Sequence, residues 1–192
     1  VGALADSFPN LRVIEEPAAG GMYAAINEAA SVAGEWSAMT YLNDDDVLLP
    51  DFSAVVRCSG AEGSGIVYGG VRLIDRDGRR IGAIPISPSP RLNRALYARR
   101  IEPVYQHGTV VSRGAWEKLR GFDATLRFCG DSDLLARATL AGIRFARATR
   151  AEVAAFRLRA GQLTKDREAM NAERRQVDER LHLLASRITA AH

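Results

Sequence analysis

The sequence predicts an α/β fold in which a mixed, mostly parallel sheet carries helices on both faces. Short apolar runs alternate with segments of helical periodicity through the first half of the chain, as expected when strands and helices succeed one another. A hairpin pattern follows, and the alternation then resumes. The chain has 192 residues, 47% of them hydrophobic and 26% charged, which suits one globular domain with a substantial core.

In the first half, strand-like and helical segments follow one another closely. The run "LRVI" (11–14) is a short apolar strand candidate. In "GGMYAAINEAASVAG" (20–34) the apolar residues recur at helical spacing and the last glycine stands where a helix stops. "EWSAMTYL" (35–42) has strand-like content and runs into a cluster of aspartates, after which a proline opens a helix over 50–59.

The second half begins with a predicted hairpin. "GIVYGGVRLI" (65–74) and "RRIGAIPI" (79–86) are strand-like and flank the turn "DRDG" (75–78). Further strands are expected at 107–112, 143–148 and 152–159. Further helices are expected in 88–100, at 113–121 and 131–142, and from 162 to the end, with Thr164 as the cap of the last one.

Composition and charge exclude several classes of protein. The net charge is +3, and the basic residues are almost all scattered arginines, so nucleic-acid binding is not indicated. Cys58 and Cys129 could pair, but two cysteines do not make a disulfide framework, and a reducing cytoplasm is the expected location. No run of 18 apolar residues predicts a membrane span, and no signal peptide opens the chain, whose first residue is valine.

The chain divides into a main domain, residues 1–160, and a helical extension, residues 161–192. In the extension apolar residues recur at spacings of three, four or seven. Such a helix packs on its own domain, or it offers an apolar face to a partner subunit or to the membrane surface. The second alternative would place the protein at the inner face of the membrane as a peripheral protein.

Three consecutive carboxylates, Asp44, Asp45 and Asp46, follow the strand-like segment that ends at Leu42. Like charges repel, and a turn or a helix cap needs only one aspartate. A divalent cation relieves the repulsion, because Mg²⁺ and Mn²⁺ prefer oxygen ligands and commonly bridge carboxylates to substrate phosphates. The stretch therefore predicts a metal site, with a solvated loop as the alternative.

Five motifs occur in order along the chain and together resemble the inverting glycosyltransferases of family 2, which have the GT-A nucleotide-sugar fold. They are "GGMYAAINEAASVAGEW", "YLNDDDVLLPDF", "QHGTVVSRGAWEKLRGFDATL", "GDSDLLARATLAG" and "FRLRAGQLT". The resemblance spans most of the chain. It implies a GT-A-like fold, and a metal-dependent transfer from a nucleotide-sugar donor to a glycan or lipid-linked acceptor.

The resemblance also implies roles for Asn43, Asp44, Asp45 and Asp46, which together are called the acidic corner. Asp45 matches the aspartate that binds the Mg²⁺ or Mn²⁺ of the donor diphosphate. Asp46 falls on the next acidic position and Asp44 on a variable one, so all three are candidate metal ligands. Asn43 stands where the motif usually has its first aspartate, and is a candidate donor contact.

The catalytic base implied by the resemblance is Asp131, which would take a proton from the acceptor hydroxyl. The alternative for Asp131 is an N-cap of the helix that follows, although Ser132 or Asp133 could cap it instead. Asp133 is expected to be structural.

Four further residues match family positions near the substrates. Tyr23, Asn27, Gln106 and His107 are therefore candidate donor or acceptor contacts. For His107, a structural role at a strand start is the alternative.

The resemblance starts late, because the family's first strand and its second strand with the "D-G-S-T" loop do not precede residue 1. The chain thus resembles a glycosyltransferase of surface polysaccharide or lipid-linked glycan synthesis that lacks its leading portion. Its sheet is expected to expose an edge, which would favour a homo-oligomer. Two other functions stay open. One is an inactive scaffold module, and the other is a nucleotidyltransferase, which would need a Gly-rich phosphate loop that is not found.

Overall fold

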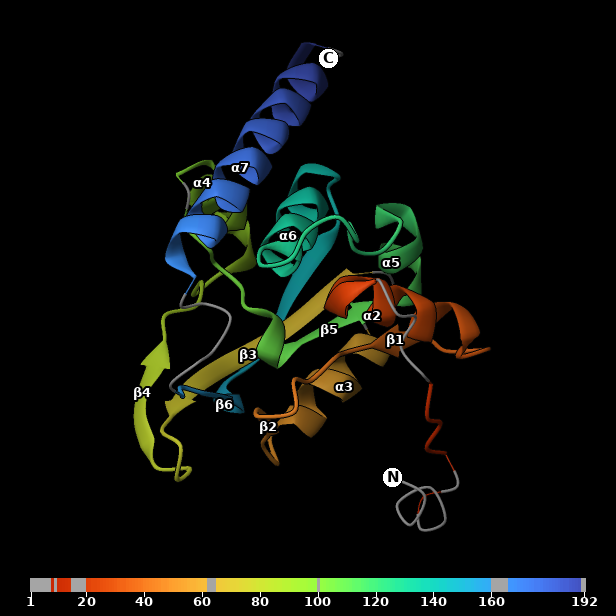
Figure 1. Cartoon of the computed structure of the whole chain (residues 1–192), viewed down its shortest axis with the longest axis vertical. Coiled ribbons are helices and arrows are strands. Elements are labelled where there is room, and N and C mark those ends of the chain that lie inside the picture. The colour runs from red at the N-terminus through yellow and green to blue at the C-terminus, as the bar shows by residue number, and fades with distance from the viewer. Residues whose placement is uncertain are drawn as a thin grey trace.

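A six-stranded mixed sheet lies at the centre of the computed structural model, which describes residues 8, 10–14, 20–61, 65–99, 101–159 and 166–190 (Figure 1). The strands are β1 (Ala38–Met39), β2 (Val47–Leu48), β3 (Gly65–Ile74), β4 (Arg80–Ile84), β5 (Thr109–Ser112) and β6 (Arg144–Arg157). Their order is β1-β5-β3-β6-β2, and β4 pairs with the second half of β3.

Helices make up most of the remaining described chain. They are α2 (Gly21–Val32), α3 (Phe52–Ala61), α4 (Asn93–Ala98), α5 (Arg113–Leu119), α6 (Gly130–Leu140) and α7 (Arg167–Ala190), with short 3₁₀ helices η1 (Pro90–Leu92) and η2 (Gln106–Gly108). The helix expected at 20–34, the helix after the proline at 50, and the hairpin at 75–78 are confirmed. In the hairpin, the Asp75 carboxylate accepts hydrogen bonds from the amides of Asp77 and Arg79, both at 2.9 Å.

The mixed sheet is confirmed, but the prediction that it is mostly parallel is wrong for the described strands. Only β3 and β6 pair in parallel, while the pairs β1–β5, β5–β3, β3–β4 and β2–β6 are antiparallel. Parallel pairing requires a long crossover, which the chain makes between β3 and β6. The hairpin turn, in contrast, forces β4 to run against β3.

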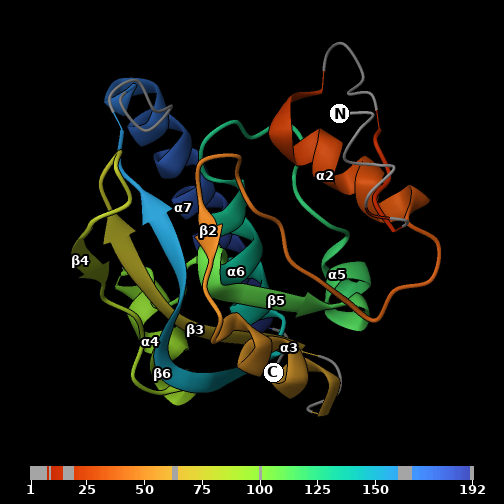
Figure 2. The same ribbon diagram turned by 90° about the horizontal axis from the view of Figure 1, so that it is seen from below.

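Side chains of β3 and β5 alternate between two apolar cores, one on each face of the sheet. Ile66 and Tyr68 pack with Val111 beneath α2, α5 and α6, whereas Val67 and Val110 pack against α3. Figures 1 and 2 show α3 on one face and α5 and α6 on the other. The prediction of helices on both faces is therefore confirmed.

Four predicted elements differ in the structure. Residues 11–14 do not form a strand, and only Ala38–Met39 is paired within the segment 35–42. The two strands expected at 143–148 and 152–159 are one strand, β6. The predicted cap Thr164 lies outside the described residues.

The last helix, α7, packs across α6 and then extends beyond the body of the protein (Figure 1). Val177, in the middle of α7, is 3% exposed, so the helix up to this residue packs on the rest of the protein. Among the described helices, none is both long and apolar enough to cross a membrane.

Candidate functional site

The acidic corner lies between β1 and β2, against the end of β6. Asp46 is 7% exposed and points into the protein. One carboxylate oxygen accepts the amide of Arg157 at 3.0 Å, and the other accepts Asn43 Nδ2 at 2.9 Å. The second oxygen also lies 3.2 Å from His107 Nε2. Burial raises the pKa of Asp46, but His107, the Arg157 amide and Asn43 outweigh it and hold the pKa below its ordinary value.

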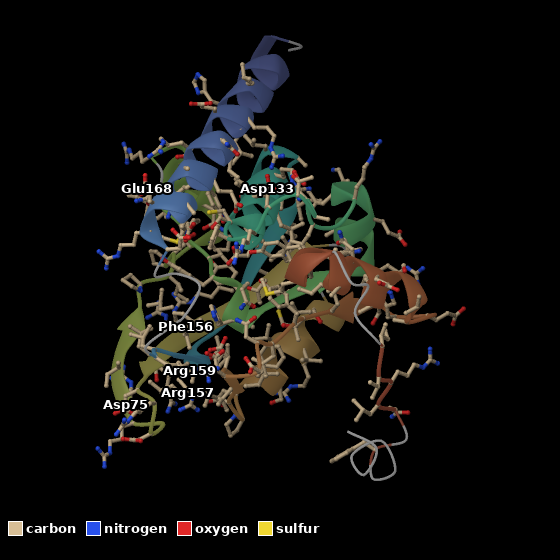
Figure 3. The ribbon with its side chains drawn as sticks, viewed as in Figure 1. Asp75, Asp133, Phe156, Arg157, Arg159 and Glu168 are labelled. Carbon is tan, nitrogen blue, oxygen red and sulfur yellow. The ribbon has the colours of Figure 1, made fainter. Side chains whose placement is uncertain are left out.

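The other two aspartates face a single arginine. Asp45 Oδ2 accepts a hydrogen bond from Arg159 Nε at 2.8 Å, and Asp44 Oδ1 lies 3.5 Å from Arg159 Nη2. The Asp44 side chain is 95% exposed and that of Asp45 is 11% exposed. Figure 3 shows Arg157 and Arg159 together at the end of β6. The corner thus divides into a buried acid, Asp46, and two acids that face Arg159.

Asp44 and Asp45 fit a divalent cation better than Asp46 does. Their carboxylates converge on the Arg159 guanidinium, which holds the place that a cation would take between them. Both carboxylate oxygens of Asp46 accept hydrogen bonds from protein donors, and the metal role predicted for Asp46 stays a prediction. No group of three His, Cys, Asp or Glu side chains suited to a metal occurs among the described residues. A cation here would depend on one or two carboxylates together with ligand oxygens.

Asp131 lies in the first turn of α6, and Cys129 is the residue at the N-cap position. Asp131 is therefore not the helix cap. The Tyr23 hydroxyl lies 3.4 Å from both Asp131 Oδ1 and the Asp131 amide, and it donates to the carbonyl of Phe128 at the same distance. A Cβ on Gly130 would approach the Tyr23 ring to 2.5 Å, so only glycine permits this contact. Tyr23, predicted as a substrate contact, lies against the predicted base.

The surroundings of Asp131 favour its neutral form. Burial raises the pKa of Asp131, and the negative charge of Glu102 raises it further. The Ser132 amide and the charge of His107 oppose this, but the net pKa is above its ordinary value. A carboxylate with a raised pKa is a stronger base once it is ionised, as proton abstraction requires.

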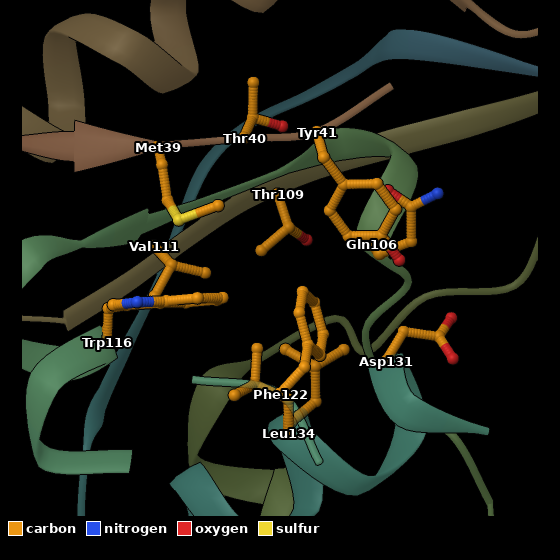
Figure 4. Close-up of a pocket in the computed structure, with 11 residues that line it drawn as sticks. Met39, Thr40, Tyr41, Gln106, Thr109, Val111, Trp116, Phe122, Asp131 and Leu134 are labelled. Atoms are coloured by element: carbon orange, nitrogen blue, oxygen red, sulfur yellow. The ribbon is translucent and has the colours of Figure 1, made fainter. Parts of the chain in front are cut away.

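Asp131 and the acidic corner meet around Tyr41 and His107. Burial is the main cause of the raised pKa of Tyr41, and the charges of Asp131 and Asp46 raise it further. His107 lies beside Asp46 and also acts on the pKa of Asp131. A small hollow has Tyr41, Gln106 and Asp131 at one end and apolar side chains at the other (Figure 4). The two groups of acids are therefore neighbours, although they are 85 residues apart in the sequence (131 − 46).

Several buried polar atoms around this hollow have no hydrogen-bond partner within the described structure. They are Thr40 Oγ1, Gln106 Oε1 and Nδ1 of His107, whose other ring nitrogen faces Asp46. Thr40 and Gln106 line the hollow, and His107 stacks on Phe156 with ring centroids 4.5 Å apart. Buried polar groups are normally satisfied, so these atoms are suited to the hydroxyl or phosphate oxygens of a ligand. The predicted roles of Gln106 and His107 agree with this placement and stay predictions.

The side chain of Asn27 has a structural task, and its predicted ligand contact stays a prediction. Its Oδ1 accepts the amide of Phe122 and its Nδ2 donates to the carbonyl of Phe122, both at 2.9 Å. Gly121, with φ +67°, passes so close that a Cβ there would lie 2.6 Å from Asn27 Oδ1. Asn27 therefore fastens α2 to the loop before α6. Asn43 has a similar local task, because its side chain donates to Asp46.

Sequence reasoning missed Tyr41, Glu102 and Arg159 as parts of the site. Glu102 accepts a hydrogen bond from the hydroxyl of Ser132, the residue next to Asp131, and pairs with Arg174 of α7 at 3.1 Å. Arg159 belongs to the motif "FRLRAGQLT", which gave this arginine no role of its own. An isolated acid in a loop and one arginine among many carry no local signal, so only the tertiary structure identifies them.

Comparison with known proteins supports the fold. No protein-family model and no curated protein sequence matches the chain. Among solved structures, it is similar to S. aureus TarS, residues 1–349, in complex with UDP-GlcNAc, with a TM-score of 0.60 and 15% sequence identity. The match covers 91% of this chain and 52% of that one, so the chain spans about half the length of TarS 1–349. At this level of identity the likeness concerns the fold alone, and the chain has an α/β fold similar to that of TarS 1–349.

Proposed function

We propose that this chain is a glycosyltransferase domain that moves a sugar from a nucleotide-diphospho-sugar to a hydroxyl of a glycan or lipid-linked acceptor, with inversion. The observation that carries the proposal is that Asp131, with a raised pKa, lines a hollow with Tyr41 and Gln106, while Asp46 of the acidic corner lies beside His107, the residue next to Gln106. Two further findings support it: the fold is similar to that of a protein that binds UDP-GlcNAc, and the motifs resemble family 2.

In the proposed reaction Asp131 accepts the proton of the acceptor hydroxyl as the oxygen attacks the anomeric carbon. The C–O bond to the donor diphosphate breaks on the opposite face, and the diphosphate leaves with the bonding electron pair. Glu102 and burial keep Asp131 basic, and Tyr23 holds its carboxylate. The unpartnered atoms of Gln106, Thr40 and His107 supply hydrogen bonds to the substrates.

Asp45, with Asp44 beside it, would hold a Mg²⁺ or Mn²⁺ ion at the edge of the site. Such an ion, when bound, stabilises negative charge on a departing diphosphate. Arg159 must leave Asp45 for the ion to bind, and its guanidinium is then able to pair with a phosphate oxygen. Asp46 keeps its position by bonding to Arg157 and Asn43.

Calorimetry with UDP-GlcNAc and UDP, in the presence and absence of Mn²⁺, tests the proposal. We expect Mn²⁺-dependent binding that Asp45→Ala removes and that Asp77→Ala, an exposed acid of the hairpin turn, leaves unchanged. Asp131→Asn should retain binding but lower sugar transfer by about 10²–10⁴-fold, the usual contribution of a general base. Absence of binding to a panel of nucleotide sugars would favour the non-catalytic alternative.

A further inference from the structure

The first half of α7 is bonded directly to the loop that leads into Asp131. Glu173 accepts three backbone amide hydrogen bonds from consecutive residues. One carboxylate oxygen accepts from Phe128 and Cys129, at 2.7 and 2.6 Å, and the other accepts from Arg127 at 2.7 Å. Hydrogen bonds to an ionised carboxylate are roughly twice as strong as neutral ones. The Glu173 side chain thus holds residues 127–129 by three hydrogen bonds, and this segment ends two residues before Asp131, the predicted base.

The opposite side of the same loop is held by α2. The Tyr23 hydroxyl contacts the carbonyl of Phe128 and the carboxylate of Asp131, and the Tyr23 ring lies against Gly130. The loop therefore lies between a carboxylate from α7 and an aromatic side chain from α2. Cys129 at the N-cap position makes no side-chain cap bond, so the cap itself does not fix the start of α6.

Two more contacts bind α7 to the surroundings of Asp131. Arg174, the residue after Glu173, pairs with Glu102, whose charge acts on Asp131. Arg180, two turns further on, bridges Asp123 and the fully buried Asp133. The helix thus contacts the loop before Asp131, the acid beside it, and an acid that follows it in α6.

We propose that Glu173 is a positioning residue for Asp131, so that the first half of α7 belongs to the catalytic machinery and not only to the core. The inference rests on the proposed function, because it assumes that Asp131 is the base. It follows from geometry: the carboxylate fixes three consecutive amides of a short loop, and an error of about 1 Å in the position of a base can cost about 100-fold in rate. Glu173 acts through the backbone, and it is not expected to touch the substrate.

The test compares Glu173→Ala and Glu173→Gln with Glu168→Gln, which changes an exposed glutamate of the same helix (Figure 3). UDP-GlcNAc turnover is measured from pH 4 to 8, and the Asp131 carboxyl is titrated by ¹³C NMR in the same variants. We expect kcat to fall about 10–100-fold for Glu173→Ala and less for Glu173→Gln, which keeps one acceptor oxygen. KM should change little, and the Asp131 titration should shift in both variants. Glu168→Gln should behave as the unmodified chain.

Two outcomes overturn the inference in different ways. If Glu173→Ala folds and keeps both the kcat and the Asp131 titration of the Glu168→Gln control, Glu173 does not position Asp131. If the unmodified chain turns over no nucleotide sugar, the proposed function fails, and the NMR titration alone then decides whether Glu173 positions the carboxyl. Faster hydrogen exchange at the amides of Arg127, Phe128 and Cys129 in Glu173→Gln checks that their hydrogen bonds to residue 173 have been weakened.

Discussion

At the scale of single residues, the surroundings of Asp46 and Asp131 shift the pKa values of these two acids in opposite directions. Asp46 accepts hydrogen bonds from protein donors and has a lowered pKa. The pKa of Asp131, in contrast, is raised by burial and by the charge of Glu102. Carboxylates with separated pKa values are typical of sites in which one acid carries fixed charge and the other moves a proton. The surroundings thus favour the ionised form of Asp46, and they suit Asp131 to the role of base that we propose for it.

Removal of the Glu102 charge should change the pH dependence of the reaction. The base works when it is ionised, and the negative charge of Glu102 raises the pKa of Asp131. Glu102→Gln should therefore shift the acid limb of the kcat profile to lower pH. Profiles of UDP-GlcNAc turnover for this variant and for Glu117→Gln, an exposed glutamate on α5, make the comparison. An unshifted acid limb in Glu102→Gln would separate Glu102 from the base.

Arg159 and a divalent cation should compete for the same carboxylates. Arg159 pairs with Asp45 and lies near Asp44, so Arg159→Gln should tighten Mn²⁺ binding by roughly twofold to fivefold, as expected when a surface ion pair no longer competes with the cation. Calorimetric titration of Mn²⁺ measures the effect, with Arg79→Gln in the exposed hairpin as the control. Equal or weaker Mn²⁺ binding in Arg159→Gln would argue that the two aspartates do not form a cation site.

At the scale of elements, the site depends on how α2 is fastened to the loop before α6. Asn27 makes both of its hydrogen bonds to the backbone of Phe122, and the approach of Gly121 leaves no space for a side chain. Because α2 also carries Tyr23, this link fixes the distance between Tyr23 and the loop that holds Asp131. The side-chain amide of Asn27, for which the family resemblance predicts a ligand contact, connects α2 to the loop before α6.

Asn27→Ala should lower the free energy of unfolding by about 2–4 kcal/mol, because it leaves two partly buried backbone groups of Phe122 without partners. Urea denaturation measures this change. Asn171→Ala, on the exposed surface of α7, is the matched control and should stay within about 0.5 kcal/mol of the unmodified chain. A similarly small loss for Asn27→Ala would mean that the link contributes little to stability.

At the scale of the whole molecule, folding should depend on the charge of Asp123. A hydrogen bond from Thr125 and the nearby Arg180 hold the pKa of Asp123 at about 2, against the opposing effect of burial. A folded pKa below the unfolded value of about 3.9 stabilises the fold above that pH, and the contribution is lost as pH falls toward 2. In urea denaturation from pH 6 to 3, Asp123→Asn should be less stable than the unmodified chain at pH 6, and the gap should narrow on acidification. A gap that does not depend on pH would show that this charge is not linked to folding.

Much of the fold could be predicted from local signals, while the arrangement of the sheet could not. Helix periodicity and turn residues located α2, β3 and the hairpin. The segment between Arg147 and Glu152 looked like a break between two strands. In the structure β3 advances by two residues, from Tyr68 to Gly70, while β6 advances by five, so β6 accommodates three extra residues and continues. Strand direction depends on which distant segments pair, and no local pattern encodes that.

The candidate site was predictable only in part, for the same reason. Asp45 and Asp131 stood out by their motifs, and the structure places their surroundings next to each other. Their partners Arg159, Glu102 and Glu173 come from segments between 29 and 114 residues away (131 − 102 and 159 − 45), where each looks like an ordinary surface charge. Whether the sheet edge pairs with a second copy, and whether the end of α7 meets a membrane, stay predictions.

The contact between Gly130 and the ring of Tyr23 has a consequence for the natural history of this chain. A methyl group at position 130 would overlap the ring, so the two positions are not independent of each other. Among descendants that keep the chemistry, a glycine should accompany every aromatic at position 23, and a larger residue at 130 should arise only after that ring has been lost. An alignment of related sequences would show the order in which substitutions at positions 23 and 130 arose.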